Sequence, residues 1–156
     1  MMAEEPDAPG VIVFPPLLFG GALLVGLLVD WAWPVHPLPH TISRIAGALV
    51  LVASIALARW AERAMHHAGT NVRPDRPTLA IVSSGPFRYS RNPLYIASTG
   101  LVAAIALLFD AAAPLVLLVP VLLVVRYGVI AREERYLEAK FGEPYRAYME
   151  RVRRWI

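Results

Sequence analysis

The chain has 156 residues, enough for one domain, and 57% of them are hydrophobic while only 17% are charged. This composition excludes an ordinary water-soluble domain, and the lack of cysteine excludes disulfide and thiolate chemistry. The formal net charge of +3 is modest, and we expect no nucleic-acid partner. Apolar segments of membrane-spanning length therefore define the class of protein.

Four apolar segments are predicted to cross a membrane as helices, because the bilayer core offers no water to the backbone. The first, residues 11–29, contains Pro15 and Pro16, which predict a kink or a delayed start of the helix. The other three segments are residues 42–60, 93–109 and 113–130. Three glycines are expected to allow close packing of the first helix: Gly20, Gly21 and Gly26. We therefore expect an all-α polytopic membrane protein with about four transmembrane helices, as one domain over residues 1–156.

The arginines of the chain predict its orientation in the membrane. Residues 61–92 and 131–156 are rich in arginine, whereas the other two connections between the apolar segments carry almost none. The positive-inside rule therefore predicts that this loop, this tail and both termini are cytoplasmic, in a bacterial inner membrane. The leader holds Glu4, Glu5 and Asp7 in place of the basic residues that begin a signal peptide.

The cytoplasmic tail is predicted to form two helices. The first extends from about Arg126 to Lys140, and Gly142 is a plausible helix stop. Pro144 suits the first turn of the second helix. The inner stripe of that helix is expected to consist of Tyr145, Tyr148 and Val152.

The stretch GPFRYSRNPLYIAS, residues 85–98, leads into the third apolar segment. Asn92 is a favoured helix N-cap and Pro93 a favoured first residue, so that Arg88 and Arg91 can be simple interfacial anchors. The same pattern also fits a binding site, because a helix N-terminus beside arginines attracts a carboxylate or phosphate. Two neighbouring side chains add flat surfaces that carry a hydroxyl: Tyr89 and Tyr95.

Glu133 and Glu134 form a second candidate group. Between Arg132 and Arg135 they can be a solvated helix face, as most charge runs are. Glu134, however, shares a helix face with Leu137, and ionisable groups near a membrane span are costly unless they are paired or functional. A carboxylate at this place can accept hydrogen bonds from ribose hydroxyls or from an ammonium group.

The remaining polar residues give weaker indications. His66 and His67 are adjacent and point apart on a helix, and we expect no metal site. Two further histidines and one carboxylate are expected on the outer side: His36, His40 and Asp110. Three residues of the turn-rich piece AGTNVRPDRP are candidates to fold over a ligand, although a plain surface loop explains them as well: Asn71, Arg73 and Arg76.

The order of these features resembles the isoprenylcysteine carboxyl methyltransferase family and the similar phospholipid N-methyltransferases. The resemblance rests on GTNVRPDRPT, then SSGPFRYSRNPLYIA, then EERYLEAKFGEPYRAYMERVRR, and covers residues 69–154. Either motif alone is weak, but the two are separated by two spans and return to the same side of the membrane.

The resemblance implies an integral membrane enzyme that binds S-adenosylmethionine on its cytoplasmic side. Such an enzyme transfers the methyl group to a lipophilic acceptor that enters from the bilayer, and releases S-adenosylhomocysteine. The implied catalytic residues are Arg91, Asn92 and Glu134. The implied cofactor-binding residues are Gly85, Tyr89, Arg91, Asn92, Pro93, Tyr95, Glu133, Glu134, Tyr145 and Tyr148. The implied partners are the acceptor and membrane lipids, and the oligomeric state is left open.

Two positions depart from the family pattern. The enzymes that act on prenylated proteins usually have histidine at the position of Asn92, and asparagine cannot titrate. Many members carry arginine near the position of Val129, for which Arg126 is a candidate substitute. These departures argue against a prenylated protein as the acceptor.

Several alternatives stay open from the sequence. The acceptor can be a thioether acid, a phospholipid amine, a phenol or a thiol, and all but the acid need a base. A non-enzymatic four-helix adaptor with a basic rim for anionic lipid is a competing class. An NADPH-dependent membrane reductase of related fold is another.

Overall fold

The computed structural model describes residues 10–36, 38–72 and 76–156. Arg73 and the acidic leader residues Glu4, Glu5 and Asp7 lie outside these ranges. Within them every regular element is helical, which confirms the all-α prediction. The α-helices are α1 (Pro15–Ala32), α2 (His40–His67), α3 (Pro93–Phe109), α4 (Ala112–Val124), α5 (Ala131–Phe141) and α6 (Glu143–Arg151). A short 3₁₀ turn, Gly85–Arg88, precedes α3, and a wide π-helical turn, Val125–Ile130, joins α4 to α5.

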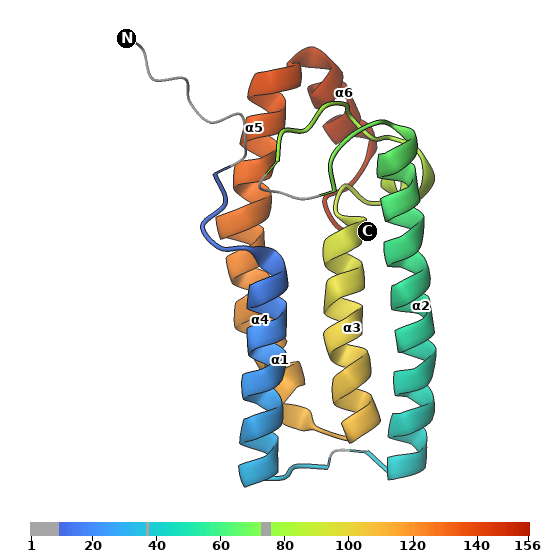
Figure 1. Cartoon of the computed structure of the whole chain (residues 1–156), viewed down its shortest axis with the longest axis vertical. Helices are drawn as coiled ribbons and strands as arrows, with labels where there is room; N and C mark the ends of the chain where they lie inside the picture. Colours follow the sequence, from blue (N-terminus) through green and yellow to red (C-terminus); the bar gives the residue numbers. More distant parts are fainter. Residues whose placement is uncertain (1–9, 37, 73–75) are drawn as a thin grey trace.

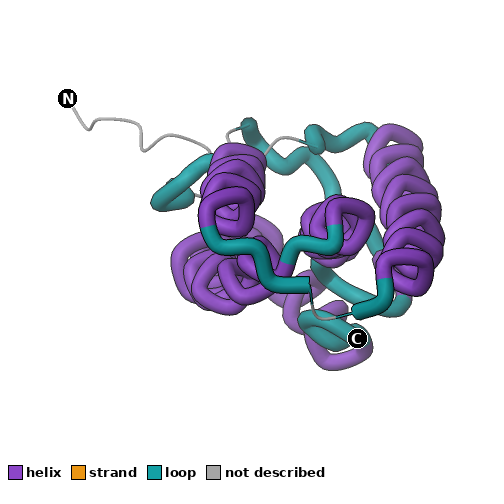
Figure 2. Tube along the Cα trace, turned by 90° about the horizontal axis from the view of Figure 1, so that it is seen from below, coloured by secondary structure: helices purple, strands orange, loops and turns teal. Residues whose placement is uncertain are grey.

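The long helices run alongside one another, and α5, α6 and the loop after α2 cover one end of them (Figure 1). Helix α3 contacts α1, α2 and α4, and α1 packs along α4. In the end view the helices are seen nearly along their axes, with loops crossing between them (Figure 2). The start of α1, the start of α3 and the end of α2 therefore meet under the same cover.

Three helical stretches are long and apolar enough to cross a membrane, namely Pro15–Ala32, His40–His67 and Ala112–Phe141. Helix α3 is a shorter apolar helix of 17 residues, about 26 Å long at 1.5 Å per residue. These helices confirm the prediction of a polytopic membrane protein. Helices α1, α2 and α4 bear many exposed apolar side chains, as expected of helices that face lipid, whereas Phe109 is the large apolar residue exposed on α3.

The helix boundaries differ from the predicted spans in two places. Helix α2 has 28 residues, about 42 Å, so it continues well past residue 60 and beyond the thickness of a bilayer core. The fourth span and the first tail helix form one continuous helix, because the π-helical turn at Val125–Ile130 widens the helix without ending it. At the start of α1, Pro15 occupies the first helical turn, so the prolines delay the helix and do not kink it.

Small residues set the closest helix contacts. A Cβ atom added to Gly26 of α1 would lie 2.6 Å from the Cα of Pro114 in α4. One added to Gly47 of α2 would lie 2.8 Å from the backbone nitrogen of Leu108 in α3. The prediction of close packing is thus confirmed for Gly26 and is wrong for Gly20 and Gly21, where an added Cβ meets nothing within 4 Å.

The tail folds as two helices that turn back over the bundle. Gly142 ends α5 with a φ of +60°, and Pro144 lies in the first turn of α6, as predicted. The expected inner stripe is confirmed for Tyr145 and Tyr148 on α6, and Val152 joins their buried cluster from the extended position just after the helix. Partly buried apolar side chains of the loop and of α5 pack against this cluster: Ile81, Leu137 and Phe141.

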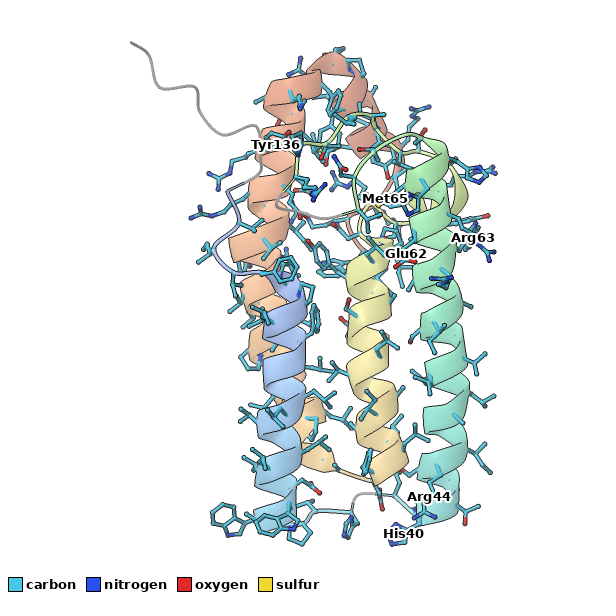
Figure 3. All side chains as sticks on the ribbon, in the orientation of Figure 1. His40, Arg44, Glu62, Arg63, Met65 and Tyr136 are labelled. Carbon is cyan, nitrogen blue, oxygen red and sulfur yellow. The ribbon has the colours of Figure 1, made fainter. Side chains whose placement is uncertain are left out.

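The opposite end of the bundle is closed by buried carboxylates. Asp30 of α1 accepts a hydrogen bond from the backbone N–H of Ala112 at 3.0 Å, at the start of α4. The side chain of Asp110 is 3% exposed, and Nδ1 of His40 lies 2.7 Å from its Oδ2, at an angle that makes no hydrogen bond. His40 and Arg44 lie at this end, whereas Met65 and Tyr136 lie at the covered end (Figure 3).

Candidate functional site

A cavity of about 340 Å³ lies at the covered end of the bundle. Its walls come from the start of α1, the loop after α2, the start of α3, and helices α5 and α6. The polar side chains in its wall are Thr70, Asn71, Thr78, Arg91, Asn92, Tyr95, Ser98, Glu133, Glu134, Tyr145 and Tyr148. This volume lies within the range of sites that bind small molecules.

The wall beside the long helices is apolar. It is formed by Phe14, Pro15 and Pro16 at the start of α1 and by Leu94 in the first turn of α3. Helix α1, which begins at these prolines, bears exposed apolar side chains along its length. The cavity therefore joins a charged wall to an apolar wall at the level where the membrane helices start.

Arg91 is the most buried cation of the cavity wall. Its side chain is 11% exposed, and its Nη2 lies 3.2 Å from Oε1 of Glu134. Its Nε and Nη1 atoms are buried and have no hydrogen-bond partner in the part of the chain that the structure describes. Buried N–H groups nearly always have a partner, so these two indicate a place where a ligand oxygen belongs.

Glu134 is held by two guanidinium groups. Besides Arg91, it accepts hydrogen bonds from Nε of Arg154 at 3.0 Å and from Nη2 of Arg154 at 2.6 Å, a bidentate pair. Arg154 lies in the segment that follows α6, where the backbone is already extended at Val152. This contact could not be predicted from the sequence, because an extended segment has no helical periodicity.

Glu133 has a different environment. The hydroxyl of Tyr95 in α3 donates to its Oε1 at 2.7 Å, which joins the two sequence motifs directly. No other hydrogen bond to the Glu133 carboxylate is formed by the described residues. Of the two glutamates, Glu133 therefore keeps oxygen lone pairs that a ligand can use, while Glu134 is occupied by arginines.

Asn92 occupies the N-cap position of α3, as predicted, but its side chain makes no capping hydrogen bond. Its Nδ2 donates to the carbonyl oxygen of Arg154 at 2.9 Å, and Oγ of Ser90 donates to the same oxygen at 3.4 Å. The backbone N–H of Arg91 donates to the carbonyl of Arg153 at 3.0 Å. The loop before α3 thus holds the segment after α6 against the cavity.

Tyr145 and Tyr148 line the cavity from α6. The hydroxyl of Tyr148 donates to the carbonyl oxygen of Phe87 at 2.8 Å. Burial raises the pKa of Tyr148 to about 12, and burial and the charge of Glu134 raise the pKa of Tyr145. Both phenols are therefore neutral at physiological pH and act as flat, polar-edged surfaces.

Other predicted residues lie outside the cavity wall. Tyr89 is 66% exposed, and its ring lies 6.4 Å from that of Trp60. Gly85 has a φ of +58° and packs against Trp60, where an added Cβ would lie 3.1 Å from Nε1. Arg126, the candidate substitute for the family arginine, is exposed and away from the cavity, and Arg154 pairs with Glu134 instead. Pro93 does line the cavity. Some residues of the motif at 85–98 therefore belong to the cavity wall, and others lie outside it.

The loop after α2 contributes the last wall. Asn71 donates from Nδ2 to the carbonyl oxygen of Pro77 at 2.8 Å, and Thr70 accepts from the N–H of Leu79 at 2.9 Å. Both Asn71 and Thr70 line the cavity, whereas Arg76 is exposed and outside it. The structure thus brings Asn71 to the site, as one of the two sequence interpretations expects.

The fold and the cavity together define a polytopic membrane protein with a small-molecule site where its helices begin. The sequence pattern of the family described as "Phospholipid methyltransferase" matches residues 42–144, more than half of the chain. The chain therefore belongs to the phospholipid methyltransferase family, which confirms the resemblance seen in its motifs.

A segment of 35 residues is 57% identical to an uncharacterized protein of Haemophilus influenzae (strain ATCC 51907 / DSM 11121 / KW20 / Rd). The aligned segment covers 22% of this chain and 56% of that protein, so the chain matches little more than half of the length of this curated relative.

Proposed function

We propose that this protein is an S-adenosylmethionine-dependent membrane methyltransferase that acts on a lipophilic acceptor. Membership of the family supports this proposal. The observation that carries it is the pair of buried Arg91 nitrogens that have no hydrogen-bond partner within the described ranges, in a cavity that Glu133 also lines. The arginines of residues 61–92 and 131–156 support a cytoplasmic location for this end of the bundle, and we propose a bacterial inner membrane.

The charges of the wall suit the charges of the cofactor. Nε and Nη1 of Arg91 are charged N–H donors that suit oxygens of the carboxylate of the amino-acid part. Glu133 can accept hydrogen bonds from ribose hydroxyls or the ammonium group. Three rings in the wall provide flat surfaces for a base or a sulfonium: Phe87, Tyr145 and Tyr148.

When bound, the cofactor supplies an electrophilic methyl group, so the protein mainly has to align donor and acceptor. The apolar wall formed by Phe14, Pro16 and Leu94 supports an acceptor that reaches the site from the lipid. A carboxylate acceptor needs no base. An amine, phenol or thiol acceptor does, and Glu133 is the wall carboxylate that forms no ion pair with the residues that the structure describes.

Calorimetric titration of the purified protein with S-adenosylhomocysteine, and separately with NADPH, tests this proposal. We expect saturable binding of S-adenosylhomocysteine with a dissociation constant of about 1–100 μM, and no binding of NADPH. Binding of NADPH alone would support the reductase class instead. Binding of neither, by a protein that unfolds cooperatively, would favour the adaptor class and contradict the proposal.

A further inference from the structure

We infer that Arg154 is a positioning residue of the cavity, which acts by fixing Glu134 and, through Glu134, the guanidinium of Arg91. This inference rests on the proposed function. Arg154 itself does not line the cavity, so it has no direct access to a ligand there. Its effect must pass through the carboxylate with which it forms its two side-chain hydrogen bonds.

The segment after α6 is held firmly enough to support such a role. Val152 is buried with Tyr145 and Tyr148, and Trp155 packs against the apolar core between the membrane helices. Between these two anchors, the carbonyl oxygens of Arg153 and Arg154 accept the hydrogen bonds from the loop before α3. The backbone on both sides of the Arg154 side chain is therefore fixed relative to α3.

The geometry of the ion pairs explains what Arg154 adds. The carboxylate of Glu134 is 13% exposed and uses both oxygens on Arg154, which sets the plane of the carboxylate. Oε1 also contacts Nη2 of Arg91, and this is the ion pair that anchors the Arg91 side chain. Bidentate pairing restricts orientation more than a point charge does, so loss of Arg154 frees Glu134 to rotate and Arg91 with it.

The charge balance leads to the same conclusion. If Glu134 had Arg91 as its sole partner, one carboxylate would neutralise one guanidinium and no positive charge would remain for an anion. With Arg154 taking most of the carboxylate, Arg91 keeps uncompensated charge and two free N–H-bearing nitrogens. The cavity then presents Arg91 as a positive pole and the Glu133 carboxyl group as a hydrogen-bond acceptor, which suits a ligand that carries both an anionic group and O–H or N–H donors.

Titration of S-adenosylhomocysteine into Arg154→Gln protein tests the inference. We expect the affinity to fall by about tenfold or more, because charge-assisted hydrogen bonds to Glu134 are lost and Arg91 loses its orientation. Arg151→Gln is the matched control, since Arg151 is exposed on α6 and its side chain donates to the carbonyl of Ala147 and to no other described residue. Its affinity should equal that of the wild type. Equal affinities of Arg154→Gln and the wild type would overturn the inference.

A double-mutant comparison separates positioning from general support of the fold. When Glu134→Gln is already present, Arg154→Gln should cause no further loss of affinity for S-adenosylhomocysteine, because the effect of Arg154 passes through Glu134. A full additional loss would show that Arg154 acts by another route and would overturn the inference. If Arg154→Gln does not unfold cooperatively, Arg154→Lys replaces it. That variant keeps the charge and loses the bidentate geometry, so its affinity should fall by about threefold or more, and an unchanged affinity contradicts the inference.

The result for the wild type distinguishes this inference from the proposed function. A wild-type protein that does not bind S-adenosylhomocysteine overturns the proposed function, and the inference with it. A wild-type protein that binds, together with an Arg154→Gln variant that binds equally well, overturns the inference alone.

Discussion

Substitution of Arg91 by glutamine is expected to lower the affinity for S-adenosylhomocysteine by about 100-fold. The variant removes the two buried nitrogens that have no hydrogen-bond partner among the described residues, and it replaces a charged group by a neutral amide. It also leaves the Glu134 carboxylate with Arg154 as its remaining ion pair. Calorimetric titration measures the loss, and thermal unfolding in the same detergent shows whether the fold is retained.

Arg88→Gln is the control for this change. Arg88 carries the same charge three positions earlier, but it is exposed and does not line the cavity. We expect its affinity to be within about twofold of the wild type, since exposed charges contribute little. Equal affinities of Arg91→Gln and Arg88→Gln would show that Arg91 does not hold the ligand.

Substitution of Gly26 by alanine is expected to destabilise the bundle by about 3 kcal/mol. The added Cβ would lie 2.6 Å from the Cα and 2.7 Å from the backbone nitrogen of Pro114, so α1 and α4 must move apart. Because α1 supplies the apolar wall of the cavity, ligand affinity should fall with stability. Thermal unfolding in detergent measures the shift.

Gly20→Ala tests whether this effect is local. Gly20 lies on the same helix, and an added Cβ meets nothing within 4 Å. Alanine has the higher helix propensity by about 1 kcal/mol, so this variant should unfold at the same or a higher temperature. A loss of stability equal to that of Gly26→Ala would contradict the close packing of α1 on α4.

The positions of the helices could be predicted from the sequence, because they follow from local rules. The location of the two motifs on one side of the membrane could also be predicted. Apolar length predicts the membrane helices, and Gly142 and Pro144 separate the tail into two helices. The buried pair of Tyr145 and Tyr148 follows from helical periodicity, whereas Val152 joins their cluster from the extended position after α6. The arginine distribution predicts that both motifs lie on one side of the membrane, and the hydrogen bond between Tyr95 and Glu133 is consistent with that prediction.

The different contacts that individual residues of the motifs make could not be predicted from the sequence. Glu133 and Glu134 are adjacent and identical in type, and only long-range contacts distinguish the one that is occupied from the one that keeps free lone pairs. Arg154 comes from an extended segment and finds its partner 20 residues away. Asn92 has the favoured chemistry of an N-cap but donates to the carbonyl of Arg154, a contact that no local rule predicts. The binding roles of Tyr89 and Gly85 stay predictions, since both lie outside the cavity wall.

We propose that the protein transfers a methyl group, in the cavity between α3, α5 and α6, to an acceptor that reaches this cavity from the membrane. Incubation of the purified protein in host lipid with S-adenosylmethionine labelled in its methyl group tests this most directly. We predict that the label enters the organic-extractable fraction with the wild-type protein and with Arg88→Gln, and does not with Arg91→Gln. A wild-type protein that binds S-adenosylhomocysteine but leaves every lipid fraction unlabelled would contradict the claim.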